Sequence, residues 1–191
     1  MTIELDRVYS LGEAFSRDAL RVNPRQTVDA SALLRGNLTI DKPLVFEISQ
    51  GRKRVDLVGT GYAGLVLVSD SFINVLSDAG FTGWTTYPVH VLGRVGDELV
   101  GYHGLSILGR CGPLDLYRGE KIIMAAPPGG TALPGWRGFH FDPSTWDGSD
   151  LFLPEGARLL FVVEAVKNAL QKAGLSNLSL ERITEIERAF P

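Results

Sequence analysis

The feature that most constrains the fold is a segment that occurs twice. Residues 65–81 read L-V-L-V-S-D-S-F-I-N-V-L-S-D-A-G-F, and residues 159–175 read L-L-F-V-V-E-A-V-K-N-A-L-Q-K-A-G-L. The segments align without a gap, 94 positions separate each residue from its counterpart, and six of the seventeen positions are identical. Each copy begins with a short apolar run, continues with apolar residues at helical spacing and ends at glycine. The pattern predicts a strand, a helix and a further strand in each copy.

The fold class that follows is α+β, in a single domain spanning residues 1–191. Two similar strand–helix–strand lobes, at about 40–110 and about 140–191, are expected to share one core. An internal duplication would explain the pairing, although any two strand-then-helix units resemble each other to some degree. A period this long excludes a solenoid, because solenoid repeats recur every 20 to 50 residues.

A glycine-rich stretch precedes the first copy and reads G-T-G-Y-A-G at residues 59–64. It matches G-x-G-x-x-G, the pattern of dinucleotide-binding loops. Such a loop places pyrophosphate at the N-terminus of the helix that it opens. Here an apolar strand at residues 65–68 follows the glycines, and the helix begins only near Ser69 or Asp70. The sequence therefore predicts a turn that leads into a strand, with no cofactor.

Composition excludes several classes of protein. The net charge is −3 and basic residues cluster only at residues 51–54, which argues against a nucleic-acid partner. Cys111 is the single cysteine, so an internal disulfide is impossible. No apolar run approaches the roughly 20 residues of a membrane helix, and the first residues lack a secretory pattern. We expect a cytoplasmic protein that does not bind a membrane.

Other elements are assigned from local patterns. Residues 14–21 predict a short helix. Residues 43–48 and 55–58 predict two strands of a hairpin, with the basic residues 51–54 at its tip. Residues 127–138, rich in proline and glycine, predict a loop without regular structure.

Catalytic residues are sought first at Cys111, eight positions after His103. The pair could form a nucleophilic dyad, but a buried thiol in a glycine-rich turn is the simpler interpretation. A second candidate is an acidic cluster of His140, Asp142, Asp147 and Asp150, which lacks a recognised metal-ligand spacing. Aspartates in this pattern also organise turns. The sequence thus predicts no catalytic residue and no metal site, and a small enzyme using either candidate remains the alternative.

Residues 135–150 are unusual because a predicted loop carries two of the three tryptophans. Tryptophan and arginine are typical anchors of protein interfaces. Acidic side chains beside them could steer a partner by charge. The alternative is that the aromatic residues of this loop cover the core between the lobes. The candidate partner-binding residues are Trp136, Arg137, His140, Asp142, Trp146, Asp147 and Asp150.

These features together resemble a known family. Residues 43–48, 55–57, 67–70 and 76–83, and later residues 149–152, 160–162 and 169–175, are similar to the immunity-protein family numbered eleven of bacterial polymorphic toxin systems. The resemblance covers roughly residues 40–185. It implies a small cytoplasmic α+β protein that neutralises a cognate protein toxin, and it carries over no catalytic residue. A small-molecule sensor domain is a further alternative.

Overall fold

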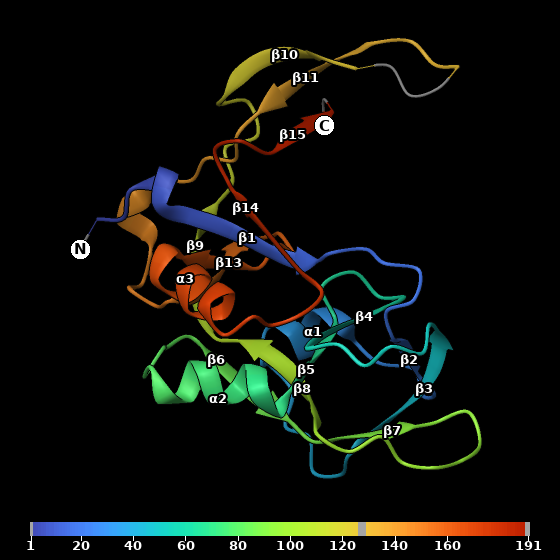
Figure 1. Cartoon of the computed structure of the whole chain (residues 1–191). Helices are drawn as coiled ribbons and strands as arrows, with labels where there is room; N and C mark the ends of the chain where they lie inside the picture. The colour runs from blue at the N-terminus through green and yellow to red at the C-terminus, as the bar shows by residue number, and fades with distance from the viewer. Residues whose placement is uncertain (1, 126–128, 190–191) are drawn as a thin grey trace.

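A computed structural model describes residues 2–125 and 129–189 of the chain. Within these residues the strands form a seven-stranded, a five-stranded and a three-stranded sheet. The two larger sheets and the helices form the body, and the three-stranded sheet lies beyond the five-stranded sheet at one end (Figure 1). The α+β class is therefore correct, in a form richer in strands than the repeat alone indicated.

The seven-stranded sheet runs in the order β6-β8-β5-β4-β2-β3-β7. Its strands are β2 (Arg21–Pro24), β3 (Leu44–Gln50), β4 (Leu57–Thr60), β5 (Val66–Ser69), β6 (Trp84–Tyr87), β7 (Val89–Leu92) and β8 (Tyr102–Ile107). The five-stranded sheet runs in the order β14-β1-β13-β12-β9. Its strands are β1 (Val8–Glu13), β9 (Gly109–Pro113), β12 (Leu151–Glu155), β13 (Phe161–Val163) and β14 (Leu178–Arg182).

The small sheet runs in the order β10-β11-β15, and all of its pairings are antiparallel. Its strands are β10 (Glu120–Met124), β11 (Leu133–Arg137) and β15 (Glu187–Ala189). The helices are α1 (Ala30–Leu34), α2 (Asp70–Asp78) and α3 (Glu164–Lys172), with short 3-10 turns η1 (Leu5–Arg7) and η2 (Pro143–Thr145). None of the helices within residues 2–125 and 129–189 could span a bilayer, and α2 and α3 have only nine residues each.

Both copies of the repeated segment contain the expected elements. The bounds of α3 lie 94 positions after those of α2, and each helix is followed by a glycine with positive φ, Gly80 at 68° and Gly174 at 66°. The hydroxyl of Ser69 accepts a hydrogen bond from the backbone N–H of Phe72 at 3.2 Å, which caps α2 at the predicted start of the helix. In the second copy Val163 takes the cap position, where no side chain caps the helix.

The sheet pairing around the two copies is also equivalent. β8 lies between β5 and β6 and is antiparallel to both. In the second copy β1 lies between β13 and β14 and is antiparallel to both. Each copy is thus a split strand–helix–strand unit whose middle strand comes from elsewhere in the chain. In the second unit, that strand is β1, Val8–Glu13, about 150 residues earlier in the chain.

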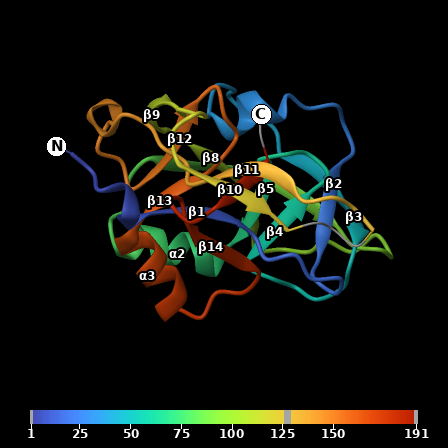
Figure 2. The same cartoon turned by 90° about the horizontal axis from the view of Figure 1, so that it is seen from above.

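The units share a core instead of forming separate halves. One apolar cluster joins Phe72 and Leu76 of α2 to Val166 and Leu170 of α3, together with inward side chains of both large sheets. The sheets also extend well past the repeated units, because residues 1–40 contribute β1 to one sheet and β2 to the other. Figure 2 shows the sheets stacked over one another when seen from above. The expected lobes at about 40–110 and about 140–191 are therefore incomplete descriptions.

Two local predictions are wrong. Residues 14–21 are not a helix. β1 ends at Glu13, and the chain then crosses to the other sheet, where β2 starts. Ala19 and Leu20 of this crossing are buried. Residues 43–48 and 55–58 do not form a hairpin, because β2 pairs with both β3 and β4 and lies between them. Tertiary pairing overrides the local pattern in both places.

Candidate functional site

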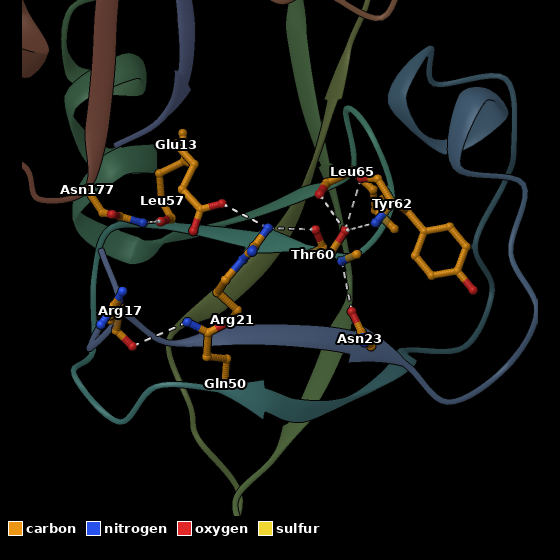
Figure 3. Close-up of polar contacts among 11 residues, drawn as sticks. Glu13, Arg17, Arg21, Asn23, Gln50, Leu57, Thr60, Tyr62, Leu65 and Asn177 are labelled. Atoms are coloured by element: carbon orange, nitrogen blue, oxygen red, sulfur yellow. Dashed lines mark hydrogen bonds and ion pairs between the residues drawn. The ribbon is translucent and has the colours of Figure 1, made fainter. Parts of the chain in front are cut away.

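The glycine-rich stretch forms the turn between the antiparallel strands β4 and β5. The hydroxyl of Thr60 donates to the carbonyl oxygen of Leu65 at 2.9 Å and accepts from the backbone N–H of Tyr62 at 3.0 Å. The side-chain oxygen of Asn23 accepts from the N–H of Gly61 at 2.8 Å (Figure 3). α2 begins only after β5, so the glycines open no helix and offer no helix N-terminus to a phosphate. The predicted turn is confirmed.

Cys111 lies on β9 and is buried in the apolar cluster that includes Phe152 and Phe161. Burial, with a smaller contribution from the charge of Asp147, raises the pKa of the Cys111 thiol to about 12. The thiol is therefore protonated at neutral pH, the opposite of what a nucleophilic cysteine requires. The ring of His103 is 2.8 Å from a carboxylate oxygen of Asp70. The simpler of the two interpretations of Cys111, a buried thiol, is the correct one.

Two aspartates of the acidic cluster organise local turns, and the third makes a long-range contact. Asp142 accepts from the backbone N–H of Ser144 at 2.9 Å, and Asp147 accepts from that of Ser149 at 3.0 Å, as aspartates in turns do. Asp150 instead accepts from the backbone N–H of Thr82 at 2.8 Å, which ties the loop to the segment after α2. Among the described residues no group of three or more histidine, cysteine, aspartate or glutamate side chains could hold a metal ion.

The ring of His140 is half-buried, and its Nδ1 is buried without a hydrogen-bond partner among the described residues. Burial, then the charge of Arg118, holds the pKa of His140 below its usual value. It is therefore a neutral ring beside the small sheet and contributes no fixed positive charge.

The predicted partner-binding residues divide between a strand and a loop. Trp136 and Arg137 lie on β11, so the prediction of a loop over residues 127–138 is wrong for residues 133–137; residues 127 and 128 lie outside the described residues. Within the described residues, Pro134 pairs with Ile123 of β10, and the pairing of β11 with β15 covers Gly135–Arg137. The other predicted residues lie between β11 and β12.

Aromatic side chains within the segment 138–150 cover one face of the five-stranded sheet. Phe141 is buried, and its ring centroid lies 5.9 Å from that of Phe152 and 6.4 Å from that of Phe161. Trp146 stacks at a tilt on Phe152 and donates from its indole N–H to the carbonyl oxygen of Ser149. The covered face is the one opposite the helices, because alternate residues of β13 belong to different clusters. These rings form a cover over the outer face, not between the two units.

The small sheet is held together by charged and aromatic side chains on its two faces. On one face Arg137 pairs with Glu120 of β10 at 2.7 Å and with Glu187 of β15 at 2.8 Å. On the other face Trp136, 7 % exposed, lies opposite Lys121 and Arg188 in the strand register, with the Lys121 ammonium 5.3 Å from its ring centroid. Trp136 is thus a buried anchor of the sheet, and Arg137 ties its three strands together.

The far end of the same sheet exposes apolar side chains. Ile123 of β10 is 73 % exposed and Leu133 of β11 is 54 % exposed. The register pairs Ile123 with Pro134 and Met124 with Leu133, so the two exposed residues point to opposite faces of the sheet. We call Ile123 and Leu133 the apolar tip. Local patterns did not predict the apolar tip, because they assigned the strand that carries Leu133 to a loop.

A second site lies where the two large sheets meet. Glu13 ends β1 of the five-stranded sheet, and Arg21 begins β2 of the seven-stranded sheet. An oxygen of Glu13 lies 3.2 Å from the guanidinium of Arg21, which also donates to the carbonyl oxygen of Thr60 at 3.2 Å (Figure 3). A cavity of about 310 Å³ opens beside this pair. No local pattern predicts this pair, because it depends on how strands of different sheets meet.

No family model matches the chain, and no curated protein sequence matches it either. The resemblance to the immunity-protein family therefore stays a prediction drawn from the residues.

Proposed function

We propose that the chain is a non-enzymatic protein-binding module, and specifically an immunity protein. It would neutralise a cognate bacterial toxin in the cytoplasm by covering the functional site of the toxin. The observation that carries the proposal is the small sheet, which lies apart from the two-sheet body and exposes the apolar tip. The resemblance of residues 40–185 to the immunity-protein family supplies the kind of partner.

A sheet normally buries at least one face against another layer. In the small sheet Trp136 is buried, but Ile123 and Leu133 are exposed on opposite faces of its far end. Exposed apolar side chains at the end of a sheet are suited to contact another protein. A toxin that packs on the apolar tip would bury side chains that now face water.

The predicted binding residues contribute in different ways to this arrangement. Trp136 and Arg137 hold the sheet in its position, so their effect on a partner is indirect. Asp142 and Asp147 remain exposed while they cap turns, and their charges stay available to steer a basic partner at a distance. We therefore place the direct contacts at the apolar tip and the longer-range attraction at the loop between β11 and β12.

The experiment co-expresses the chain with the toxin module encoded next to it and measures growth and complex formation. The double variant Ile123→Asp, Leu133→Asp is expected to fold normally and to weaken toxin binding by about a hundredfold or more, since buried charge is strongly unfavourable in an interface core. The matched control is Val95→Asp, because Val95 is 91 % exposed on a turn of the body. Full protection by the double variant would place the toxin elsewhere on the molecule.

A further inference from the structure

The cavity beside Glu13 and Arg21 has the composition of a small-molecule site. Its volume of about 310 Å³ falls at the lower end of the range for such sites. It is lined by residues from both large sheets, and interfaces of this kind are a common place for ligands. Its walls include the buried side chains of Leu11, Leu57, Leu65 and Leu160. An apolar ligand body would fit against these leucines.

The polar groups of the cavity are few, and they are not all satisfied. One oxygen of the Glu13 carboxylate pairs with Arg21, while the other, Oε1, is buried without a hydrogen-bond partner among the described residues. A buried acceptor without a donor is unfavourable. Glu13 lines the cavity and the terminal torsion of a glutamate is broad, so its carboxylate can turn to meet a donor on a ligand. The site can therefore accept a hydrogen bond that the protein itself does not supply.

The cavity lining also includes a cation. Arg158 is one of the lining residues and is exposed, and within residues 2–125 and 129–189 no side chain forms an ion pair or hydrogen bond with its guanidinium. Because Glu13 and Arg21 neutralise each other, Arg158 leaves the lining with one positive charge. A free guanidinium is suited to bind a carboxylate through two parallel hydrogen bonds.

We propose that this cavity binds a small organic carboxylate with a hydrogen-bond donor and an apolar body, of which an apolar α-amino acid is the simplest example. The ligand carboxylate pairs with Arg158, its ammonium donates to Glu13, and its side chain packs on the leucines. The inference is independent of the proposed function, since it concerns the body and not the small sheet.

Gly12 offers a matched control that leaves the cavity unchanged. It lies on β1, its φ is outside the left-handed region, and a Cβ added to it would meet no heavy atom within 4 Å. Because side chains alternate along a strand, a side chain at residue 12 would point away from the face on which Leu11 and Glu13 line the cavity. Valine favours strands, so Gly12→Val is expected to fold and to bind the ligand as the wild type does.

The test is calorimetry and thermal unfolding of the purified chain with L-leucine, L-isoleucine, L-phenylalanine and 2-hydroxy-4-methylpentanoate at up to millimolar concentration. At least one of these probes is expected to bind saturably and to raise the unfolding temperature. Leucinamide, which lacks the carboxylate, and 4-methylpentanoate, which lacks the donor, are each expected to bind at least tenfold more weakly.

Variants assign the contacts. Arg158→Gln and Glu13→Gln are each expected to weaken binding by about tenfold to a hundredfold, the usual effect of losing a hydrogen bond to a charged group. Gly12→Val, and Arg25→Gln, which breaks an exposed ion pair with Glu47, should leave it unchanged. Absence of saturable binding by every probe, or unchanged binding by both Arg158→Gln and Glu13→Gln, would overturn the inference. Because no toxin is present, either result leaves the proposed function untouched.

Discussion

Asp56 accepts two hydrogen bonds from Ser176, one from the backbone N–H at 2.8 Å and one from the hydroxyl at 2.6 Å. Asp56 directly precedes β4, and Ser176 follows α3, so the contact ties the first unit to the second. The other carboxylate oxygen accepts from the hydroxyl of Ser69 at 2.7 Å. One carboxylate thus connects the cap of α2 to the loop that ends α3.

The first prediction concerns pH. Burial acts to raise the pKa of Asp56, but the hydrogen bonds from Ser176 and Ser69 together outweigh it, and the pKa in the folded protein is lowered. The contact therefore stabilises the fold above the unfolded pKa of about 3.9, and that contribution is lost as the pH falls through the lower folded pKa. In urea titrations between pH 2 and 7, Asp56→Asn is expected to reduce stability at pH 7 and to flatten this dependence. Asp78→Asn, at an exposed position of α2, should match the wild type.

The second prediction compares two glycines. A Cβ on Gly59 would overlap the carboxylate of Glu13, whereas one on Gly12 would meet open space. Because the atoms that the Gly59 Cβ would meet are the end of a flexible side chain, Gly59→Ala is expected to shift the Glu13 carboxylate away from Arg21 and to lower the free energy of unfolding by about 1 kcal/mol, the typical net value of a lost hydrogen bond. Gly12→Ala should change it by less than about 0.5 kcal/mol. Urea denaturation measures both, and equal effects would show that Glu13 does not rest on Gly59.

The third prediction tests the shared core. Leu76 of α2 and Leu170 of α3 are fully buried in the same cluster. Each change to alanine is expected to cost about 3 kcal/mol, and the double variant should depart from the sum by at least about 0.5 kcal/mol. Leu76→Ala combined with Val91→Ala, which lies in a different cluster, should be additive. Additivity in the first pair as well would mean that the two helices do not share a core.

The fourth prediction concerns Cys111. Because burial raises the pKa of its thiol to about 12, the native protein at pH 8 is expected to react with a disulfide reagent at least a hundredfold more slowly than the unfolded chain. Because the chain has a single cysteine, the unfolded protein in denaturant should consume one equivalent of the reagent. The same difference implies that stability decreases as the pH rises above about 8.5, where only the unfolded thiol ionises. Fast labelling of the native protein would show that β9 opens readily.

The repeated segment could be read from the sequence because its signals are local. Ser69 caps a helix, Gly80 and Gly174 end one, and apolar residues recur at the right period between them. The glycine turn at residues 59–64 was predictable for the same reason, since the strand after it is strongly apolar.

The elements that were missed depend on distant partners. β1 and β2 are defined by strands far along the chain, and β11 contains a proline and a glycine that local rules assign to loops. Glu13 and Arg21 meet because a seven-residue crossing joins two sheets. No rule of sequence spacing predicts an ion pair across such a crossing. Burial of Cys111 was expected from the residue type, while the position of the apolar tip was not.

The place of β1 in the second unit has a consequence for how the protein is made. β1 ends at residue 13, yet its partner β13 ends only at residue 163. At 5–20 residues per second, the ribosome adds the intervening 150 residues in roughly 8 to 30 s. During that interval the emerging chain can complete its first unit, whereas β1 has no partner strand β13 with which to pair. Nascent chains cut short before β13 should therefore keep their first strand unpaired and open to proteases and chaperones.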